Sequence, residues 1–322
     1  MKTKLHLLST LLLLATPAAR SAVTFTFDYS DPSAAAMSPA ARAALDVAGA
    51  NMAAYFGNYN ANVVYEIQTY SDPVSSNLAS SGPYFGSTTP GFGNLGALGT
   101  KIVTNGATDL TGAAPDALMI INMGDWWDYS SAGANDANYW HMISVAMHEI
   151  GHGLGFLNAT HAENGTTWLV NYGFATDPMA YMPMDQFMVN GIGEHVISPL
   201  FTLNQSVWDG AKTGGPGTVP ATPNSGLYFS GPNGMAANGG QMIPFWSPSG
   251  FEEGSTNHHL GSYYRNALMF PYFEAAEVRD ALTPVEIGIL KDLGYTLIVP
   301  EPGSALLVLC GLGLVLRRRR AT

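Results

Sequence analysis

The segment 140–155 constrains the fold of this chain more than any other. Its apolar residues recur at alternating spacings of three and four: Trp140, Ile143, Met147, Ile150 and Leu154. Residues at such spacings lie on one face of an α-helix. Asn135 or Asp136 can cap the start of this helix, and Gly153 and Gly155 favour its end. The sequence therefore predicts a helix, with one apolar face turned toward a core.

The same helix carries the sequence His148-Glu149-Ile150-Gly151-His152. Two histidines four residues apart on a helix point the same way, so both imidazoles can bind one metal ion. A zinc ion lowers the pKa of a bound water toward ~7, and Glu149 lies where it can accept the proton of that water. The motif predicts a zinc site with Glu149 as general base. The alternative is that both histidines lie on a solvated helix face.

The stretch 148–156 resembles the metzincin zinc peptidases, whose pattern is HExxHxxGxxH or HExxHxxGxxD. Gly155 matches the glycine of that pattern, which lets the chain turn after the second ligand. The chain departs from the pattern at its last position, where Asn158 stands, and an amide is a poor zinc ligand. This departure indicates the leishmanolysin-like branch, in which the third histidine follows far downstream and is itself followed by the methionine of the Met-turn.

The segment 254–271 is similar to the corresponding part of that branch. It contains two neighbouring histidines, His258 and His259, then Leu260, and after these Leu-Met-Phe-Pro around Met269. The resemblance implies His259 as the third ligand beside His148 and His152, and Met269 as the Met-turn methionine. His258 fits instead if the intervening loop has lost no residue. His161 is a further alternative, although its spacing from His152 matches no known pattern.

The remaining patterns predict an α+β domain. Alternating apolar residues predict strands over 23–29, 62–70 and 117–123, and helical spacing predicts helices over 38–56 and 277–293. Thr283-Pro284 is an alternative start for the main part of the last helix. Ser38 and Pro39 form a good helix start. The segment 71–99 is rich in Gly, Ser and Pro, which predicts loops. The segment 158–257 is rich in Gly, Asn, Pro and Ser, and we expect short strands and turns within it.

The resemblance, which extends over about 117–295, implies how these elements assemble. A metzincin-like fold has a mixed sheet packed on the helix 38–56 and on the zinc helix. The domain would then cover 22–298, with an N-terminal subdomain to about residue 158 and a loop-rich C-terminal subdomain over 159–298. We expect the strand 117–123 to rim the substrate cleft, where an extended peptide can add as a further strand.

Both ends of the chain have the composition of addressing signals. Residues 1–21 combine Lys2 and Lys4 with a short leucine run and then small residues, as in a secretory signal peptide. Residues 299–322 contain Pro-Glu-Pro, an apolar run and four arginines, which resembles the PEP-CTERM sorting tail of Gram-negative bacteria. That resemblance implies removal of the tail by an exosortase, only transient membrane contact, and a secreted or cell-surface location.

Charge and cysteine content exclude several kinds of site. The formal net charge is −11, and seven of the 13 basic residues lie in the two terminal segments, so nucleic acid is disfavoured as a partner. The one cysteine, Cys310, lies in the tail, so the domain has no thiol for zinc or for catalysis. The acidic composition is compatible with bound calcium, but it does not by itself predict a calcium site. Asp125, Asp128 and Asp136 lack EF-hand spacing and suit capping or solvated roles.

The expected function is that of a secreted, zinc-dependent endopeptidase acting on peptides or proteins. One alternative is a non-catalytic surface or exopolysaccharide-matrix protein that keeps the fold, and another is a metal-dependent hydrolase of a different bond. The intact Glu149 favours an enzyme, because a structural zinc site needs no general base. Of the other residues, His141 is expected on the helix surface and His195 in a loop without a role. Trp126 and Trp127 either line the cleft or pack in the core.

Overall fold

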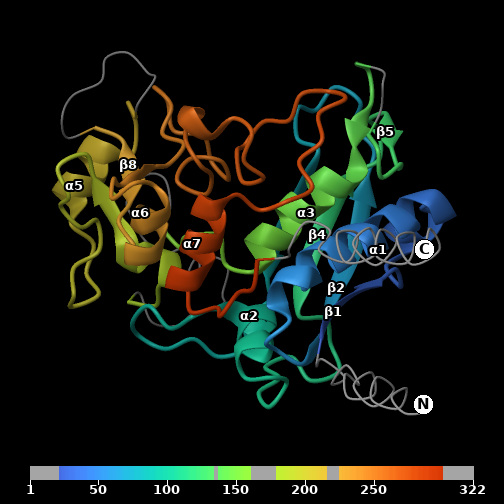
Figure 1. Ribbon diagram of the computed structural model, residues 1–322, viewed down its shortest axis with the longest axis horizontal. Coiled ribbons are helices and arrows are strands. Elements are labelled where there is room, and N and C mark those ends of the chain that lie inside the picture. Colours follow the sequence, from blue (N-terminus) through green and yellow to red (C-terminus); the bar gives the residue numbers. More distant parts are fainter. Residues whose placement is uncertain (1–21, 134–136, 161–178, 216–224, 300–322) are drawn as a thin grey trace, which may run out of the picture.

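The computed structural model describes residues 22–133, 137–160, 179–215 and 225–299 (Figure 1). These residues form an α+β structure whose main sheet has four strands in the order β1-β2-β4-β3. The strands are β1 (Val23–Asp28), β2 (Ala61–Tyr70), β4 (Ala117–Asn122) and β3 (Ala79–Pro83). Both β1 and β4 run parallel to β2, whereas β3 runs antiparallel to β4. The sheet is therefore mixed, as expected.

Two helices cover one face of this sheet. Helix α1 (Pro39–Ala53) begins after Ser38, whose side chain accepts the Ala41 N–H, and α3 (Met142–Gly153) lies beside it (Figure 1). The two helices contact each other, α1 contacts β1, and α3 contacts β3. Along β2 the side chains alternate between buried and more exposed positions, because one face packs on the helices. Expectation and structure agree on this layer.

Helix α3 begins later than the sequence predicted. Residues 134–136 lie outside the described residues, and the chain around Trp140 pairs instead with a short strand, so that β5 (Trp127–Asp128) lies parallel to β6 (Trp140–His141). The helix starts at Met142 and ends at Gly153, and Gly155 follows with a φ of +93°. That left-handed conformation suits glycine at a helix end. Every residue of α3 is buried, which excludes a solvated face for its histidines.

The half of the chain after residue 179 has shorter elements. A three-stranded antiparallel sheet has the order β7-β8-β9, with α5, α6 and α7 around it. Its elements are β7 (Met188–Asn190), α5 (Gln205–Ala211), β8 (Leu227–Phe229), α6 (Pro232–Ala237), β9 (Ile243–Pro244) and α7 (Pro284–Asp292). A 3-10 turn, Pro183–Phe187, precedes β7. Helix α7 packs on α6 (Figure 1).

Three expectations about local structure were wrong. The segment 71–99 is not only loop, since it contains β3 and the start of α2 (Gly96–Val103). The last helix does not begin at residue 277 but at the alternative start, where Thr283 is the cap and Pro284 the first residue. The strand 117–123 does not rim the cleft: β4 is paired on both sides, and β3 is the edge strand beside it. Nothing in the glycine- and serine-rich composition of β3 favoured a strand, which is formed by pairing with β4.

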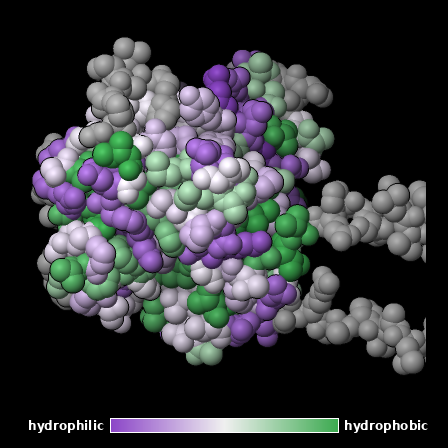
Figure 2. Space-filling model, turned by 60° about the vertical axis from the view of Figure 1, so that its left-hand side comes forward, coloured by the Kyte–Doolittle hydropathy of each residue, from purple (hydrophilic) through white to green (hydrophobic). Residues whose placement is uncertain are grey.

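The two predicted addressing signals, residues 1–21 and 299–322, lie almost wholly outside the described residues, as does His161. Among the described helices, none has the length and apolar character needed to cross a bilayer. On the face of the molecule in Figure 2, hydrophilic and hydrophobic residues are interspersed.

Candidate metal centre

Three histidine side chains converge in one buried cluster. His148 and His152 come from successive turns of α3, and His259 comes from the loop before residue 260. The three Nε2 atoms are each 3.1 Å from the other two. Each histidine is at most 6% exposed. Within the described residues, the fold thus places three nitrogen ligands around a single point.

A backbone carbonyl fixes the orientation of each imidazole. The Nδ1 atom of His148 lies 2.6 Å from Leu268 O, that of His152 lies 2.8 Å from Phe156 O, and that of His259 lies 2.9 Å from Ser255 O. A carbonyl only accepts, so each Nδ1 carries the proton and each Nε2 presents a lone pair. Carbonyl partners of this kind set the tautomer of metal-binding histidines. The site is therefore prepared to receive a cation.

The spacing and protonation of the cluster suit a metal ion. A tetrahedral ion with bonds of 2.0–2.1 Å to nitrogen separates its ligand atoms by about 3.3 Å, close to the distances here. Burial lowers the pKa of His152 to about 4 and lowers those of His148 and His259 well below their usual range. All three are neutral at pH 7, which is the form that binds metal. The triad can hold a metal ion.

Glu149 lies next to this cluster and is also buried. Its side-chain atom Oε2 has no hydrogen-bond partner within the described part of the chain, and burial raises the pKa of the carboxyl group to about 8. An unpartnered buried carboxyl group is costly, so such groups are uncommon without a role. A cation held by the histidines would favour its ionised form. Glu149 is thus placed to exchange a proton near the cluster.

Met269 packs against α3 between the two histidine ligands of that helix in the sequence, at Gly151. A Cβ atom added to Gly151 would lie 2.5 Å from Met269 Sδ, so the glycine allows the methionine to pack directly on α3. The Met269 N–H donates to Glu286 Oε1 over 2.6 Å, and its carbonyl accepts the Leu260 N–H over 2.8 Å. The turn that carries Met269 is therefore tied both to α7 and to the chain next to His259.

Arg279 binds backbone carbonyls on both sides of Met269 in that turn. Its buried guanidinium donates to Ala267 O, 3.1 Å away, and to Tyr272 O, 2.7 Å away, and it pairs with Glu277 at 2.6 Å. The guanidinium also lies over the ring of Phe273, 4.4 Å from the centroid. The Phe273 ring in turn meets His148 edge to face. Neither Arg279 nor Glu286 was identified from the sequence, although Thr283 and Glu286 have the spacing of a capping box.

Asn158 occupies the position that holds the third ligand in the HExxHxxGxxH pattern. It is fully buried and lies outside the triad. Its Nδ2 group donates to Asn257 O over 2.6 Å, two residues before His259. Asn257 has a φ of +61°, in the left-handed region that few residues adopt readily. Asn158 therefore ties the end of the α3 segment to the loop that presents His259.

An open cleft of about 640 Å³ leads to the histidines. One wall consists of residues 76–81, at and before the edge strand β3, and the other consists of residues 252–255 and 271–273. Val145, Glu149 and the three histidines line it as well. A ligand in the cleft can therefore reach both Glu149 and a metal ion held by the triad.

The other histidines lie apart from the triad. His258 lines the cleft and is half-buried, and His195 is exposed. The expectation for His141 was wrong: it is buried at the start of α3, with Nδ1 2.7 Å from Ser144 Oγ and Nε2 2.9 Å from Ser130 O. The chain enters α3 from β6 and not from a preceding helical turn, so this side chain faces inward.

Asp125, Asp128 and Trp127 have structural roles. Asp125 accepts a hydrogen bond from Asn122, and Asp128 accepts two from Ser130, as turn residues do. Trp127 is buried and donates to Asn122 O, whereas Trp126 is 62% exposed. Asp136 lies outside the described residues. These carboxylates therefore give no support to a calcium site.

Comparison of the chain with models of known protein families finds no match, and comparisons with curated proteins and with solved structures find none either. The geometry of the site therefore carries the functional argument.

Proposed function

We propose that this protein is a secreted zinc-dependent endopeptidase in which Glu149 is the general base. The observation that carries the proposal is the buried Glu149 oxygen Oε2, which has no hydrogen-bond partner in the described part of the chain, beside three neutral imidazoles that line an open cleft. A purely structural metal site usually has four protein ligands and no need of a neighbouring base. Three nitrogen ligands with a carboxyl group in reach are instead the arrangement of a hydrolytic zinc site.

Zinc is the metal we propose for the triad. Three imidazoles with an open fourth position form the ligand set of catalytic zinc, and the domain offers no thiolate that would favour another metal class. When bound, zinc would polarise a peptide carbonyl and lower the pKa of water. The Leu268, Phe156 and Ser255 carbonyls would hold the imidazoles in place while the substrate changes.

Glu149 would carry the proton during hydrolysis. Its Oε2 atom accepts a proton from the attacking water and then delivers it to the nitrogen of the leaving amine. Burial raises the pKa of this carboxyl group to about 8, which makes the ionised group a stronger base, and a bound cation would favour the ionised form that accepts the proton. The surrounding walls of the cleft limit the access of other water to the reacting atoms.

The edge strand β3 would bind the peptide. Its outer side faces the cleft and is not paired with another strand of the described sheet. An extended peptide can add to such an edge through backbone hydrogen bonds, which bind many sequences alike. The substrate class we propose is therefore an unfolded polypeptide segment.

The metzincin resemblance, with its leishmanolysin-like branch, supports the same assignment. The spacing of His148, His152 and His259, and Met269 packed under the helix, agree with it. We extend the proposal to the ends of the chain: residues 1–21 direct export, and an exosortase removes the tail. Intact-mass analysis of protein from the native host checks both cleavages.

The test uses purified protein with measured zinc content. We expect casein hydrolysis that a chelator abolishes and that added zinc restores. Glu149→Ala should keep its zinc and lose activity by a factor of ~1000 or more, because proton transfer and water activation both fail. Glu253→Ala, which changes an exposed glutamate on the cleft wall, is the matched control and should stay within about threefold of the unchanged protein. Near-normal activity of Glu149→Ala would show that the mechanism is wrong.

A further inference from the structure

Two exposed aromatic side chains adjoin Trp140, a residue that lines the cleft. Trp126 is 62% exposed and Tyr139 is 37% exposed, and their ring centroids are 5.8 Å apart. Large aromatic rings are usually covered, and exposed ones gather at binding surfaces. The rings are tilted by 44°, so they do not form the flat platform on which a sugar ring stacks. We call Trp126 and Tyr139 the aromatic pair.

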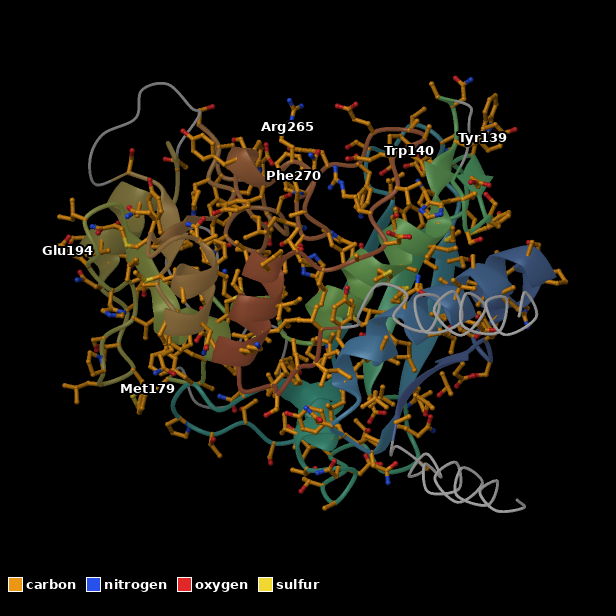
Figure 3. The ribbon with its side chains drawn as sticks, viewed as in Figure 1. Tyr139, Trp140, Met179, Glu194, Arg265 and Phe270 are labelled. Atoms are coloured by element: carbon orange, nitrogen blue, oxygen red, sulfur yellow. The ribbon has the colours of Figure 1, made fainter. Side chains whose placement is uncertain are left out.

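The backbone joins the aromatic pair to the cleft. Trp140, which follows Tyr139, lines the cleft, and its N–H donates to Trp126 O over 2.8 Å. Figure 3 shows Tyr139 and Trp140 in the same part of the molecule, and Trp140 belongs to β6. Trp140 therefore links the aromatic pair to the cleft that leads to the metal centre.

Both walls of the cleft are bonded to the segments that carry the pair. The Asn122 amide donates to Asn77 O on one wall and to Asp125, the residue before Trp126. On the other side, Ala276, which follows the wall 271–273, donates its N–H to Tyr139 O over 2.8 Å. The segments that carry the aromatic pair therefore adjoin both walls of the cleft.

We propose that Trp126 and Tyr139 form an outlying subsite for the polypeptide substrate, which binds an apolar or aromatic side chain several residues from the cleaved bond. The inference rests on the proposed peptidase function. A peptide that continues the antiparallel pairing that β3 makes with β4 has its C-terminal half toward Ala79, the start of β3. Residues 76–78, before that strand, are bonded through Asn77 to the segment that leads to Trp126. The subsite therefore binds the part of the substrate that follows the cleaved bond.

The test compares two peptides that share one cleaved core. The short peptide ends just after the core, and the long peptide continues through eight further residues that include phenylalanine. Trp126→Ala should lower the ratio of kcat/KM for the long peptide to kcat/KM for the short peptide by about tenfold. A loss of this size is expected when an aromatic contact that the substrate covers is removed. Tyr139→Ala should lower it less, and Trp126→Phe should restore most of it. Tyr263→Ala, at a tyrosine that is 77% exposed and does not line the cleft, is the control and should leave the ratio within twofold.

An unchanged ratio in Trp126→Ala overturns the subsite, and so does an equal loss for both peptides. The subsite is also wrong if Trp126→Ala cleaves both peptides normally but loses binding to a soluble polysaccharide. If the zinc-loaded protein cleaves neither peptide, the proposed function itself fails, which is a different result from a fixed ratio.

Discussion

The two halves of the molecule position their parts of the candidate metal centre in different ways. Residues 22–160 form the sheet, α1 and α3, and this half supplies His148, Glu149 and His152 on one rigid helix. Residues 179–299 have short elements, and this half supplies His259 and Met269 from loops. In the first half, helical geometry positions the site residues. In the second half, individual side-chain hydrogen bonds position them.

Those bonds are specific and few. Glu286 holds the backbone of Met269, Arg279 holds the carbonyls around it, and Asn158 holds the chain before His259. A helix distributes its stability over many repeated hydrogen bonds, whereas a loop depends on each one. The comparison therefore predicts that changes in the second half disturb metal binding without unfolding the sheet.

The largest effect should follow removal of the third imidazole. His259→Ala leaves two nitrogen ligands, and we expect the zinc affinity to fall by on the order of 1000-fold, as for His148→Ala or His152→Ala, since each ligand of a zinc site contributes about 4 kcal/mol. Far-ultraviolet circular dichroism should stay unchanged, because the sheet and α3 do not depend on His259. Metal titration with a competing chelator measures the affinity.

His258→Ala is the matched control, because this histidine is adjacent in sequence and lines the cleft without joining the triad. It should change the zinc affinity by less than about tenfold, as expected for a group that does not ligate. The reverse result, with normal affinity in His259→Ala and a large loss in His258→Ala, would assign the third ligand to His258.

The sequence was most informative where the backbone is regular. The alternation in β2 and the cap at Ser38 predicted their elements correctly, because local preference and burial agree there. It failed at β3, whose serines and glycine pair with β4 despite low strand propensity, and at the start of α3, where pairing of Trp140 with Trp127 replaces a helical turn. Pairing with a strand elsewhere in the chain determines both β3 and the start of α3, and such pairing is not visible in the local sequence.

The candidate site could also be predicted from the sequence only where the backbone is regular. The two histidines four apart required only a helix, whereas the choice between His258 and His259 needed the loop geometry. The support from Arg279 and Asn158 consists of bonds between residues about 10 and 100 positions apart. Nothing in the composition near either residue indicates the carbonyl that it binds.

A smaller effect should distinguish the two sides of α3. Gly153 packs on the first half: a Cβ atom there would overlap the Tyr65 hydroxyl, which belongs to the sheet. Gly153→Ala should therefore destabilise the fold by about 3 kcal/mol, the upper range for overpacking against a rigid neighbour. Urea unfolding measures the loss. The double variant Gly153→Ala with Tyr65→Phe should recover part of it, and failure to do so would contradict the overlap.

Gly151 packs on the second half, against Met269, and provides the comparison. Met269 has a flexible side chain, so Gly151→Ala should cost only about 1 kcal/mol of stability. Its effect should appear instead at the metal centre, because Met269 and Leu268 move with the turn that holds His148. If Gly151→Ala destabilised the fold as strongly as Gly153→Ala, the two halves would not differ in rigidity as proposed.

A further small effect concerns Asn158, one of the side chains that join the halves near the site. Asn158→Ala removes the 2.6 Å bond to Asn257 O and frees the loop before His259. We expect the zinc affinity to fall by ~10-fold, the lower range for residues that orient a ligand. Zinc should still bind, because all three imidazoles remain. The visible absorption spectrum of the cobalt-substituted protein should change, since it reports the geometry of the ligands.

Asn94→Ala is the matched control for this last variant. Asn94 is also a buried asparagine, and its amide donates to the carbonyls of Thr89, Gly91 and Tyr181, away from the triad. Its loss should lower the urea midpoint and leave the cobalt spectrum unchanged. If both variants lowered stability and neither altered the spectrum, Asn158 would only stabilise the fold. A spectral change confined to Asn158→Ala would mean that the asparagine at the position of the usual ligand holds the replacement ligand in place.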